Sequence, residues 1–253
     1  MTYIQGFVIA VPTANKQKFI DHASLGDPVF LKHGATRVLE CWQDKVEKGH
    51  TTDFFGAVEA KEDESVVFSW LEWPSKEVHD AMEARMEELM KTEPGFDMEK
   101  NPMPFDGKRM IYGGFEPVVE EGRVTTDPYV QGFIVPVPAG NQDAYRKAAL
   151  DMWHIMKDYG ALRVVEAWQD NVPKGQQTDF YRAVKAEDGE IVVFSFIEWE
   201  SREICDGAHE KMMQDERMKQ WEGQEANMPF DGKRMVYGGF KPVVELTREL
   251  AGA

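Results

Sequence analysis

The sequence predicts an α+β protein made of two ferredoxin-like repeats, each an antiparallel sheet with helices on one face, which pair within the chain as a barrel. Three observations support this fold class. The chain of 253 residues contains an internal duplication. Apolar residues in each repeat change between the periods of strands and of helices. Each expected sheet also has one strongly aromatic face, and because such a face is not stable in water, the two sheets are expected to cover each other.

The duplication is clearest in one long block. Residues 103–120, MPFDGKRMIYGGFEPVVE, recur as residues 228–245, MPFDGKRMVYGGFKPVVE. Two copies of this length indicate duplicated domains rather than the short units of a solenoid. We expect repeat one at residues 1–120, a short polar linker at residues 121–128 and repeat two at residues 129–253.

The apolar pattern of each repeat predicts the element order β-α-β-(β)-β-α-β. A second helix is expected after the third main strand, with Ser75 as its cap and Pro94 and Gly95 at its end. The strands of repeat one are expected at residues 3–11, 37–44, 66–73 and 109–119, with a shorter strand at residues 53–60.

The first helix is expected to differ between the repeats. In repeat two, apolar residues recur at helical spacing up to Gly160, the expected stop. Repeat one has Pro28 in the same region, and a Pro inside a helix costs about 3 kcal/mol or more. We expect this helix to split near Asp27, where repeat one lacks the side chains of Met152 and Trp153. The resulting gap predicts a small-molecule cavity in repeat one alone.

Strand alternation divides each sheet into two faces. Small residues such as Val8, Ala10 and Cys41 are expected to face the helices, because small side chains let helices pack closely. The opposite face is expected to lie against the other repeat. Its side chains in repeat one are Gln5, Phe7, Glu40, Trp42, Phe68, Trp70 and Glu72.

The composition excludes several classes of partner. The chain has 45 Asp and Glu against 29 Lys and Arg, for a net charge of -16, which repels nucleic acid and anionic membranes. No apolar run approaches the roughly 18 residues of a membrane span, and the first residues lack the basic and apolar regions of a signal peptide. We therefore expect a cytoplasmic protein. Two Cys provide neither a disulfide framework nor a structural zinc site.

No sequence pattern predicts a cofactor or a metal. None of the six His recurs at the equivalent position of the other repeat, so a site used by both repeats must rely on other groups. Dinucleotide-binding, P-loop and nucleophile-elbow motifs are also missing from the sequence.

Duplicated carboxylates are the best candidates for chemistry. Glu40 and Glu166 stand between apolar neighbours, where burial raises the pKa of a carboxyl toward the range of a working base. Such a base, beside the Trp two residues further on, can deprotonate a flat phenolic or enolic substrate. The alternative is that an Arg or a backbone donor satisfies each Glu. Glu72 and Glu198 lie near strand ends and are expected to be solvated. The expected ligand-binding residues are Trp42, Phe68, Trp70, Trp168, Phe194 and Phe196.

The most specific motif is MPFDGKRM(I/V)YGGF, which resembles the YbaA-like family, bacterial domain of unknown function 1428. Each repeat is similar to one family member over nearly its whole length, so the chain resembles a tandem fusion of two members. The family is similar to the dimeric α+β barrel superfamily, which implies that the two repeats form such a barrel within the chain. That superfamily includes cofactor-independent monooxygenases, haem-degrading enzymes, lactone isomerases and ligand-binding regulatory domains, so it implies fold more strongly than function.

Two classes of function follow from these expectations. The first is small-molecule binding, or a cofactor-independent oxygenase or isomerase reaction, in a barrel pocket. The alternative is a non-catalytic structural or protein-interaction scaffold, associated with stress, in which the barrel only buries its sheets. An enclosed void with a buried carboxylate favours the first class, and dense packing favours the second. Further self-association is compatible with both.

Overall fold

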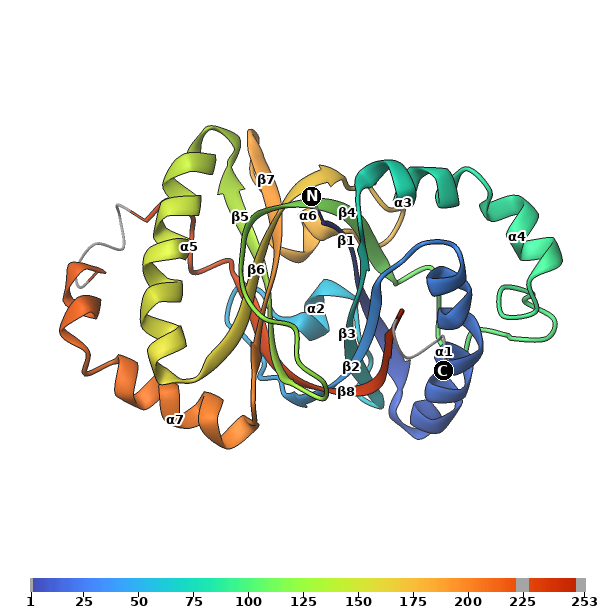
Figure 1. Cartoon of the computed structure of the whole chain (residues 1–253), viewed down its shortest axis with the longest axis horizontal. Helices are drawn as coiled ribbons and strands as arrows, with labels where there is room; N and C mark the ends of the chain where they lie inside the picture. Colours follow the sequence, from blue (N-terminus) through green and yellow to red (C-terminus); the bar gives the residue numbers. More distant parts are fainter. Residues whose placement is uncertain (1, 222–227, 249–253) are drawn as a thin grey trace.

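The computed structural model describes residues 2–221 and 228–248, in which the strands of both repeats close into one barrel (Figure 1). The order around the barrel is β1-β3-β2-β8-β5-β7-β6-β4, and β4 pairs again with β1. All neighbouring strands are antiparallel. The strands are β1 (Tyr3–Pro12), β2 (Arg37–Lys45), β3 (Glu64–Trp73), β4 (Ile111–Gly122), β5 (Tyr129–Pro138), β6 (Ala161–Asn171), β7 (Glu190–Trp199) and β8 (Val236–Thr247).

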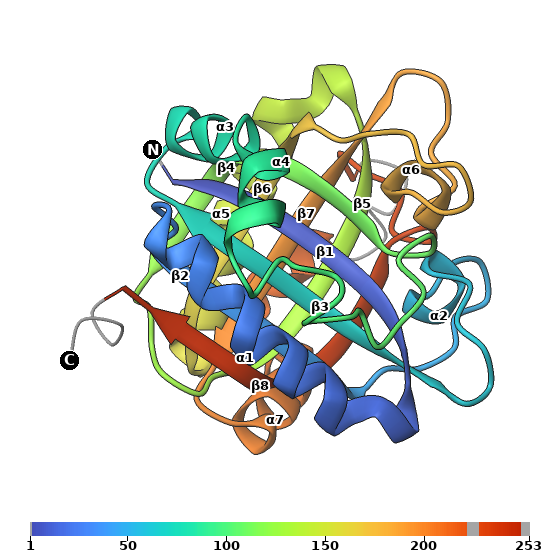
Figure 2. The same cartoon turned by 90° about the vertical axis from the view of Figure 1, so that its right-hand side faces the viewer.

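The longer helices cover the outside of the barrel on two opposite sides (Figure 1), whereas the two four-residue helices place Phe54 and Phe180 in the interior core cluster. The helices of repeat one are α1 (Lys16–Lys32), α2 (Phe54–Ala57), α3 (Lys76–Glu83) and α4 (Met86–Thr92), and those of repeat two are α5 (Gln142–Met156), α6 (Phe180–Ala183) and α7 (Arg202–Met212). Short 3-10 helices are η1 (Thr13–Asn15), η2 (Ala139–Asn141), η3 (Lys157–Tyr159) and η4 (Glu216–Trp221). Figure 2 shows α1 lying across the outer face of the sheet. No helix among the described residues is both long and apolar enough to cross a membrane.

The last strand of each repeat joins the two halves. β4 pairs with β1 of its own repeat and with β6 of the other, and β8 pairs with β5 and with β2 in the same way. Because neither repeat closes a barrel by itself, the sheet edges that each would expose are covered by the other. The predicted fold class, with two ferredoxin-like repeats paired within one chain, is confirmed.

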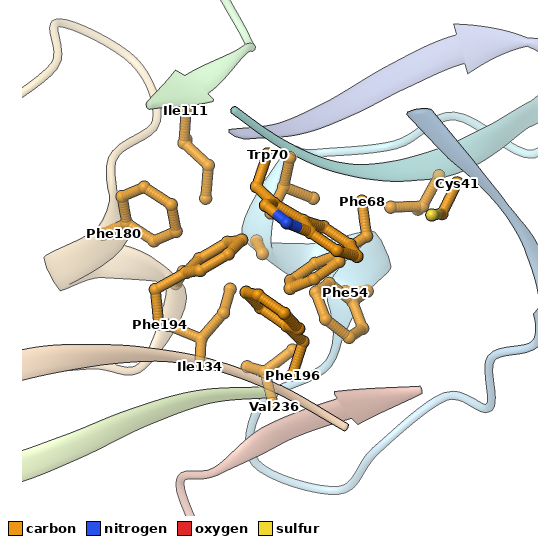
Figure 3. Close-up of a cluster of buried hydrophobic side chains, with 14 of the residues drawn as sticks. Cys41, Phe54, Phe68, Trp70, Ile111, Ile134, Phe180, Phe194, Phe196 and Val236 are labelled. Atoms are coloured by element: carbon orange, nitrogen blue, oxygen red, sulfur yellow. The ribbon is translucent and has the colours of Figure 1, made fainter. Parts of the chain in front are cut away.

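Stacked aromatic rings from the two repeats fill the barrel interior (Figure 3). The rings of Phe68 and Phe194 lie parallel with centroids 4.5 Å apart, and those of Trp70 and Phe196 lie 4.0 Å apart. A Cβ atom on Gly6 would come within 2.7 Å of the Phe194 ring, so only glycine permits this close packing of strand and ring. The aromatic residues of β3 and β7 are therefore hidden by the opposite repeat, as expected.

Two of the three predicted strand orientations are wrong. Val8 and Ala10 of β1 and Cys41 of β2 lie in the barrel interior, whereas Phe7 and Trp42 lie on the outer face of the sheet. The prediction placed all large side chains of one sheet on one face. A narrow barrel cannot hold them all at interior packing density. Beside the large rings of β3, the neighbouring strands β1 and β2 therefore contribute only aliphatic and small side chains to the interior, such as Ile4, Leu39 and Cys41.

The first helix does not split at its Pro. α1 is continuous through Pro28, with Val29 and Leu31 buried beyond it. Burial of one such side chain contributes about 1.5–3 kcal/mol, so the two together offset the cost of about 3 kcal/mol for the Pro. The predicted break near Asp27 is wrong.

Two shorter elements also differ from expectation. The region expected as a short strand contains α2, because the carboxylate of Asp53 caps that helix by accepting from the amide of Gly56. The expected second helix forms two helices, α3 and α4, separated at Ala84 and Arg85.

A buried ion network lies beyond the Trp70–Phe196 pair. Arg37 of repeat one donates to both carboxylate oxygens of Glu198, at 2.6 and 3.1 Å, and Arg163 of repeat two donates to both oxygens of Glu72, at 2.7 and 2.9 Å. Glu72 and Glu198 are 5% and 0% exposed, so the prediction that they are solvated is wrong. The other repeat covers these strand ends, and the carboxylate of each Glu is paired with an Arg of the other repeat.

Candidate functional site

A pocket of about 230 Å³ lies between α5 and the outer face of the sheet in repeat two. Glu166 of β6 and Ser195 of β7 line it from the sheet, and Ala149 and Met152 line it from α5. The small side chain of Ala149 leaves space between the helix and the strands. The chain therefore contains a cavity somewhat smaller than the roughly 300 Å³ at which drug-sized ligand pockets begin.

Glu166 is the charged group of this pocket. The residue is 9% exposed, and its Oε2 accepts a hydrogen bond of 2.7 Å from the hydroxyl of Tyr145 on α5. Burial raises the pKa of Glu166 to about 7, although hydrogen bonds from Tyr145 and Ser195 act in the opposite direction. At neutral pH the carboxyl is divided between its protonated and ionised forms, as a general acid or base requires.

The remaining described lining is almost entirely apolar. Aromatic rings and methionines surround the carboxyl, and methionine side chains adapt to ligands of different shape. The apolar lining includes Phe133, Val135, Met156, Trp221, Phe230 and Met235. Such a lining favours a flat apolar molecule whose polar group reaches the sheet.

In repeat one, Glu40 occupies the position of Glu166 beneath α1. Glu40 is 7% exposed, and its Oε2 accepts from the hydroxyl of Ser69. Burial raises the pKa of Glu40 to about 7. Phe19 stands where repeat two has Tyr145, so this carboxyl lacks the phenolic donor.

A second carboxyl is buried beside Glu40. Asp27 of α1 is 6% exposed, and burial together with the charge of Glu40 raises the pKa of Asp27 well above its ordinary range. Its Oδ2 has no hydrogen-bond partner within the described part of the chain. The space beneath α1 therefore holds two facing acids where repeat two has one acid and a pocket.

The loop after α4 is fastened onto α1. The side-chain amide of Asn101 donates to the carbonyl oxygens of Gly95 and His22, at 2.7 and 3.1 Å. A Cβ atom on Gly95 would overlap the carbonyl oxygen of Leu25, so glycine is required for this approach. Because Gly26 gives the loop room where repeat two has Met152, the helix and loop close together in repeat one.

The pocket therefore lies in the opposite repeat from the one predicted. Sequence reasoning expected a cavity where Gly26 replaces Met152. In the structure the loop around Gly95 packs at that position, whereas the side chain of Met152 lines the pocket beneath α5.

The structure separates the predicted site residues into two groups. Glu40, Trp42, Glu166 and Trp168 lie on the outer face of the sheet beneath helices. The other group, Phe68, Trp70, Phe194 and Phe196, lies in the barrel interior. The single pocket expected from both groups does not form, because alternate residues of a strand point to opposite faces and two strand orientations were assigned wrongly.

Sequence reasoning missed Tyr145, Ser195, Met152 and Phe230. Tyr145 belongs to the residues at helical spacing that predict α5. The sequence has Tyr145 in repeat two where repeat one has Phe19, and this difference could have indicated that only repeat two has a phenolic donor near its buried Glu. Ser195 lies directly opposite Glu166 where β6 pairs with β7. This neighbour could be identified only once the register of the two strands was known.

Metal-binding groupings are not found in the parts of the chain that the structure describes. No three or more His, Cys, Asp or Glu side chains of residues 2–221 and 228–248 are placed to hold a metal ion.

The arginines of the repeated MPFDGKRM block are held by ion pairs. Arg109 donates two hydrogen bonds to the carboxylate of Glu64, and Arg234 donates two to that of Glu190. These contacts agree with a structural role for the block.

Comparisons with solved structures identify the fold. An anthrone oxidase-like protein is similar over 98% of this chain and 93% of its own, with a TM-score of 0.57 and 13% identity. A "putative monooxygenase" from Lactobacillus acidophilus NCFM is similar over 98% of this chain and 96% of its own, with a TM-score of 0.58 and 10% identity. At these identities the similarity concerns the fold alone.

Comparisons of sequence identify relatives of one repeat's length. The uncharacterized protein YbaA of Escherichia coli K12 is 54% identical over 117 residues, which cover 46% of this chain and 97% of YbaA. YbaA of Shigella flexneri matches with the same values. The model of the family described as "Protein of unknown function (DUF1428)" matches residues 2–107 and again residues 128–232. The chain therefore belongs to the DUF1428 family and contains two copies of its domain.

Proposed function

We propose that the chain binds a small, flat, apolar molecule beneath α5 and that Glu166 acts there as a general base toward a weakly acidic O–H or C–H group of that molecule. The observation that carries this proposal is the buried carboxyl of Glu166 lining a pocket whose other walls are mostly apolar. The pKa of about 7 for Glu166 supports the proposal, because a carboxyl with that pKa is partly ionised at neutral pH and can accept a proton.

In the proposed reaction, the ionised carboxylate takes the proton and the electron pair of the broken bond stays on the substrate as an enolate or phenolate. Return of the proton to a different carbon gives an isomerase. Reaction of the carbanion with dioxygen, as a second substrate, gives a cofactor-independent oxygenase. Two proteins of similar fold carry oxidase and monooxygenase names, which is the reason to test oxidation as well as proton transfer.

The proposal gives the role of base to Glu166 rather than to Glu40. Glu40 faces the buried Asp27 beneath α1, where a second acid occupies the space that a substrate would need. The four interior aromatic residues, which include Phe68 and Phe194, stack on one another and are given no ligand in this proposal.

Hydrogen–deuterium exchange tests the proposed base. The probe is 2-tetralone, a flat ketone with an acidic C–H next to its carbonyl, followed by NMR in D₂O. We expect the intact chain to accelerate exchange and Glu166→Gln to lower the accelerated rate by about a hundredfold or more, the usual size of general-base catalysis. The rate should rise with pH to a plateau, with its midpoint near 7. Oxygen consumption in the same samples reports the oxidase outcome.

Filling the pocket provides a second test. Ala149→Phe places a ring in the cavity between α5 and the sheet, so it should abolish both binding of 2-tetralone and the acceleration of exchange while the circular dichroism spectrum stays unchanged. Exchange that is no faster with the intact chain than with Glu166→Gln contradicts the role of base. Exchange that survives in Ala149→Phe places the reaction elsewhere.

A second candidate, a non-catalytic scaffold, is favoured by the barrel interior. Its rings stack at 4.0–4.5 Å, and its buried charges are paired across the repeats, so the barrel itself is built as a packed core. This candidate predicts that no small apolar molecule raises the melting temperature of the chain, whereas binding in the pocket must raise it by mass action.

A further inference from the structure

The size of the pocket limits the ligand to about two fused rings. An engineered apolar cavity of about 150 Å³ holds one benzene molecule, and the pocket beneath α5 is about 230 Å³. The additional volume is enough for one more ring fused to the first. Dinucleotides, flavins and haem, each with three or more rings, exceed this space.

The polar atoms of the pocket are gathered on one wall. Glu166 and Ser195 belong to adjacent strands and stand opposite each other in the ladder, and the hydroxyl of Tyr145 reaches the same carboxyl. Apart from the Tyr145 hydroxyl, the lining from α5 and from the segment around Phe230 is apolar. A ligand therefore needs one polar group at the end that enters next to the sheet, and an apolar body behind it.

The charge of that wall determines the kind of polar group. Among the described residues that line the pocket, Glu166 carries the only carboxyl and no Lys, Arg or His is present. A ligand carboxylate or phosphate would face Glu166 without a compensating cation, which is strongly unfavourable in a buried site. A hydroxyl or ring N–H can instead donate to the carboxylate oxygens.

We infer that the ligand of the pocket beneath α5 is an uncharged aromatic molecule of two fused rings with a single hydroxyl or N–H donor, which it presents to Glu166. This inference rests on the proposed function, because it assigns a ligand class to the same pocket. It goes further in setting the size, the charge and the orientation of the molecule.

Three probes of matched size test this class against the full chain by calorimetry at pH 8: 2-naphthol, naphthalene and 2-naphthoate. We expect 2-naphthol to bind at least about tenfold more tightly than naphthalene, since a hydrogen bond to a charged acceptor has at least that effect. We expect 2-naphthoate to bind more weakly than both. In Glu166→Gln, the preference for 2-naphthol over naphthalene should shrink and the rejection of 2-naphthoate should relax.

Glu40→Gln is the matched control, because Glu40 holds the same sheet position in repeat one. All three affinities should be unchanged in this variant. Equal binding of naphthalene and 2-naphthol, or tighter binding of 2-naphthoate, overturns the ligand class while leaving a pocket that binds apolar molecules. Loss of affinity in Glu40→Gln overturns the assignment to repeat two. If none of the three probes binds, this inference fails; the proposed function fails with it only if 2-tetralone exchange is also unaccelerated.

Discussion

The carboxyl of Glu166 is subject to two opposing effects. Burial among apolar side chains favours the neutral acid, and the hydroxyl of Tyr145, at 2.7 Å, favours the carboxylate. Because burial dominates, the pKa is raised to about 7. The position of Tyr145 therefore adjusts how much of the base is ionised at neutral pH.

Removing this hydroxyl should raise the pKa of Glu166 further. We expect Tyr145→Phe, which introduces the residue type found at the equivalent Phe19, to move the titration midpoint of Glu166 upward by about one pH unit, since the hydrogen bond to a charged group is worth about 1.5–3 kcal/mol and one unit is 1.36 kcal/mol. NMR of the carboxyl carbon measures the midpoint. Phe19→Tyr in repeat one should leave it unchanged. A midpoint that does not move in Tyr145→Phe shows that this hydroxyl has no influence on the acid.

The facing acids beneath α1 should make stability depend on pH. The folded-state pKa of Glu40 is raised to about 7 and that of Asp27 is raised by burial and by Glu40. In such cases the folded state binds protons more strongly than the unfolded state, so the stabilisation present at low pH is lost as pH rises from about 4.5 toward 7 and beyond.

Asp27→Asn should therefore stabilise the chain more at pH 8 than at pH 5. We expect the difference in the free energy of unfolding between variant and native chain to grow over that interval, because burial and Glu40 disfavour the ionised form of Asp27 and the amide of the variant carries no charge. Urea unfolding at both pH values measures it. Asp21→Asn, on the exposed side of the same helix, is the control. Equal effects of Asp27→Asn at pH 5 and pH 8 would contradict a raised pKa of Asp27.

At the scale of elements, α1 and α5 occupy equivalent places on the outer face of the sheet but differ in backbone and packing. α1 contains an exposed Pro28, and α5 has His154 at that position. α1 is held down by buried residues on both sides of the Pro and by the loop that Asn101 fastens. α5 keeps a regular backbone and stands above a pocket.

The cost of the Pro should be measurable in both helices. We expect Pro28→Ala to raise the free energy of unfolding by about 1–3 kcal/mol, because an exposed Pro loses no packing and the helix regains a backbone hydrogen bond. His154→Pro should lower it by about 3 kcal/mol. Chemical denaturation of both variants tests the pair, and a destabilising Pro28→Ala would mean that the Pro itself supports the packing of α1.

At the scale of the whole molecule, the buried network of Arg37, Arg163, Glu72 and Glu198 links the two repeats. Each Arg makes paired hydrogen bonds to a Glu of the other half. Breaking one member of a buried ion pair is strongly destabilising because it leaves the other charge uncompensated. The network therefore makes correct pairing of the repeats a condition of a stable barrel.

Removing one charge of this network should be far more harmful than removing both partners. We expect Arg37→Met to lower the free energy of unfolding by about 3–5 kcal/mol and the double variant Arg37→Met with Glu198→Met to recover most of that loss. Denaturant unfolding of the single and double variants measures the difference. Lys147→Met breaks the exposed ion pair with Asp151 and should cost about 0.5 kcal/mol or less. Additive losses in the double variant would show that the two charges do not interact.

The sequence by itself determined the duplication, the α+β class, most of the strands and the pairing of the repeats, because period-2 and helical patterns and a repeated block are local properties of the chain. It also identified Glu166 as a buried acid from its apolar neighbours. Only the tertiary structure decided which face of β1 and β2 turns inward, whether α1 continues through Pro28, and which repeat contains a pocket. Each of these depends on packing between residues that lie far apart in the sequence. The rings of Phe68, Trp70, Phe194 and Phe196 fill the barrel and decide the orientation of the neighbouring strands. The loop around Gly95 packs against α1 at the position where repeat two has Met152 in its pocket.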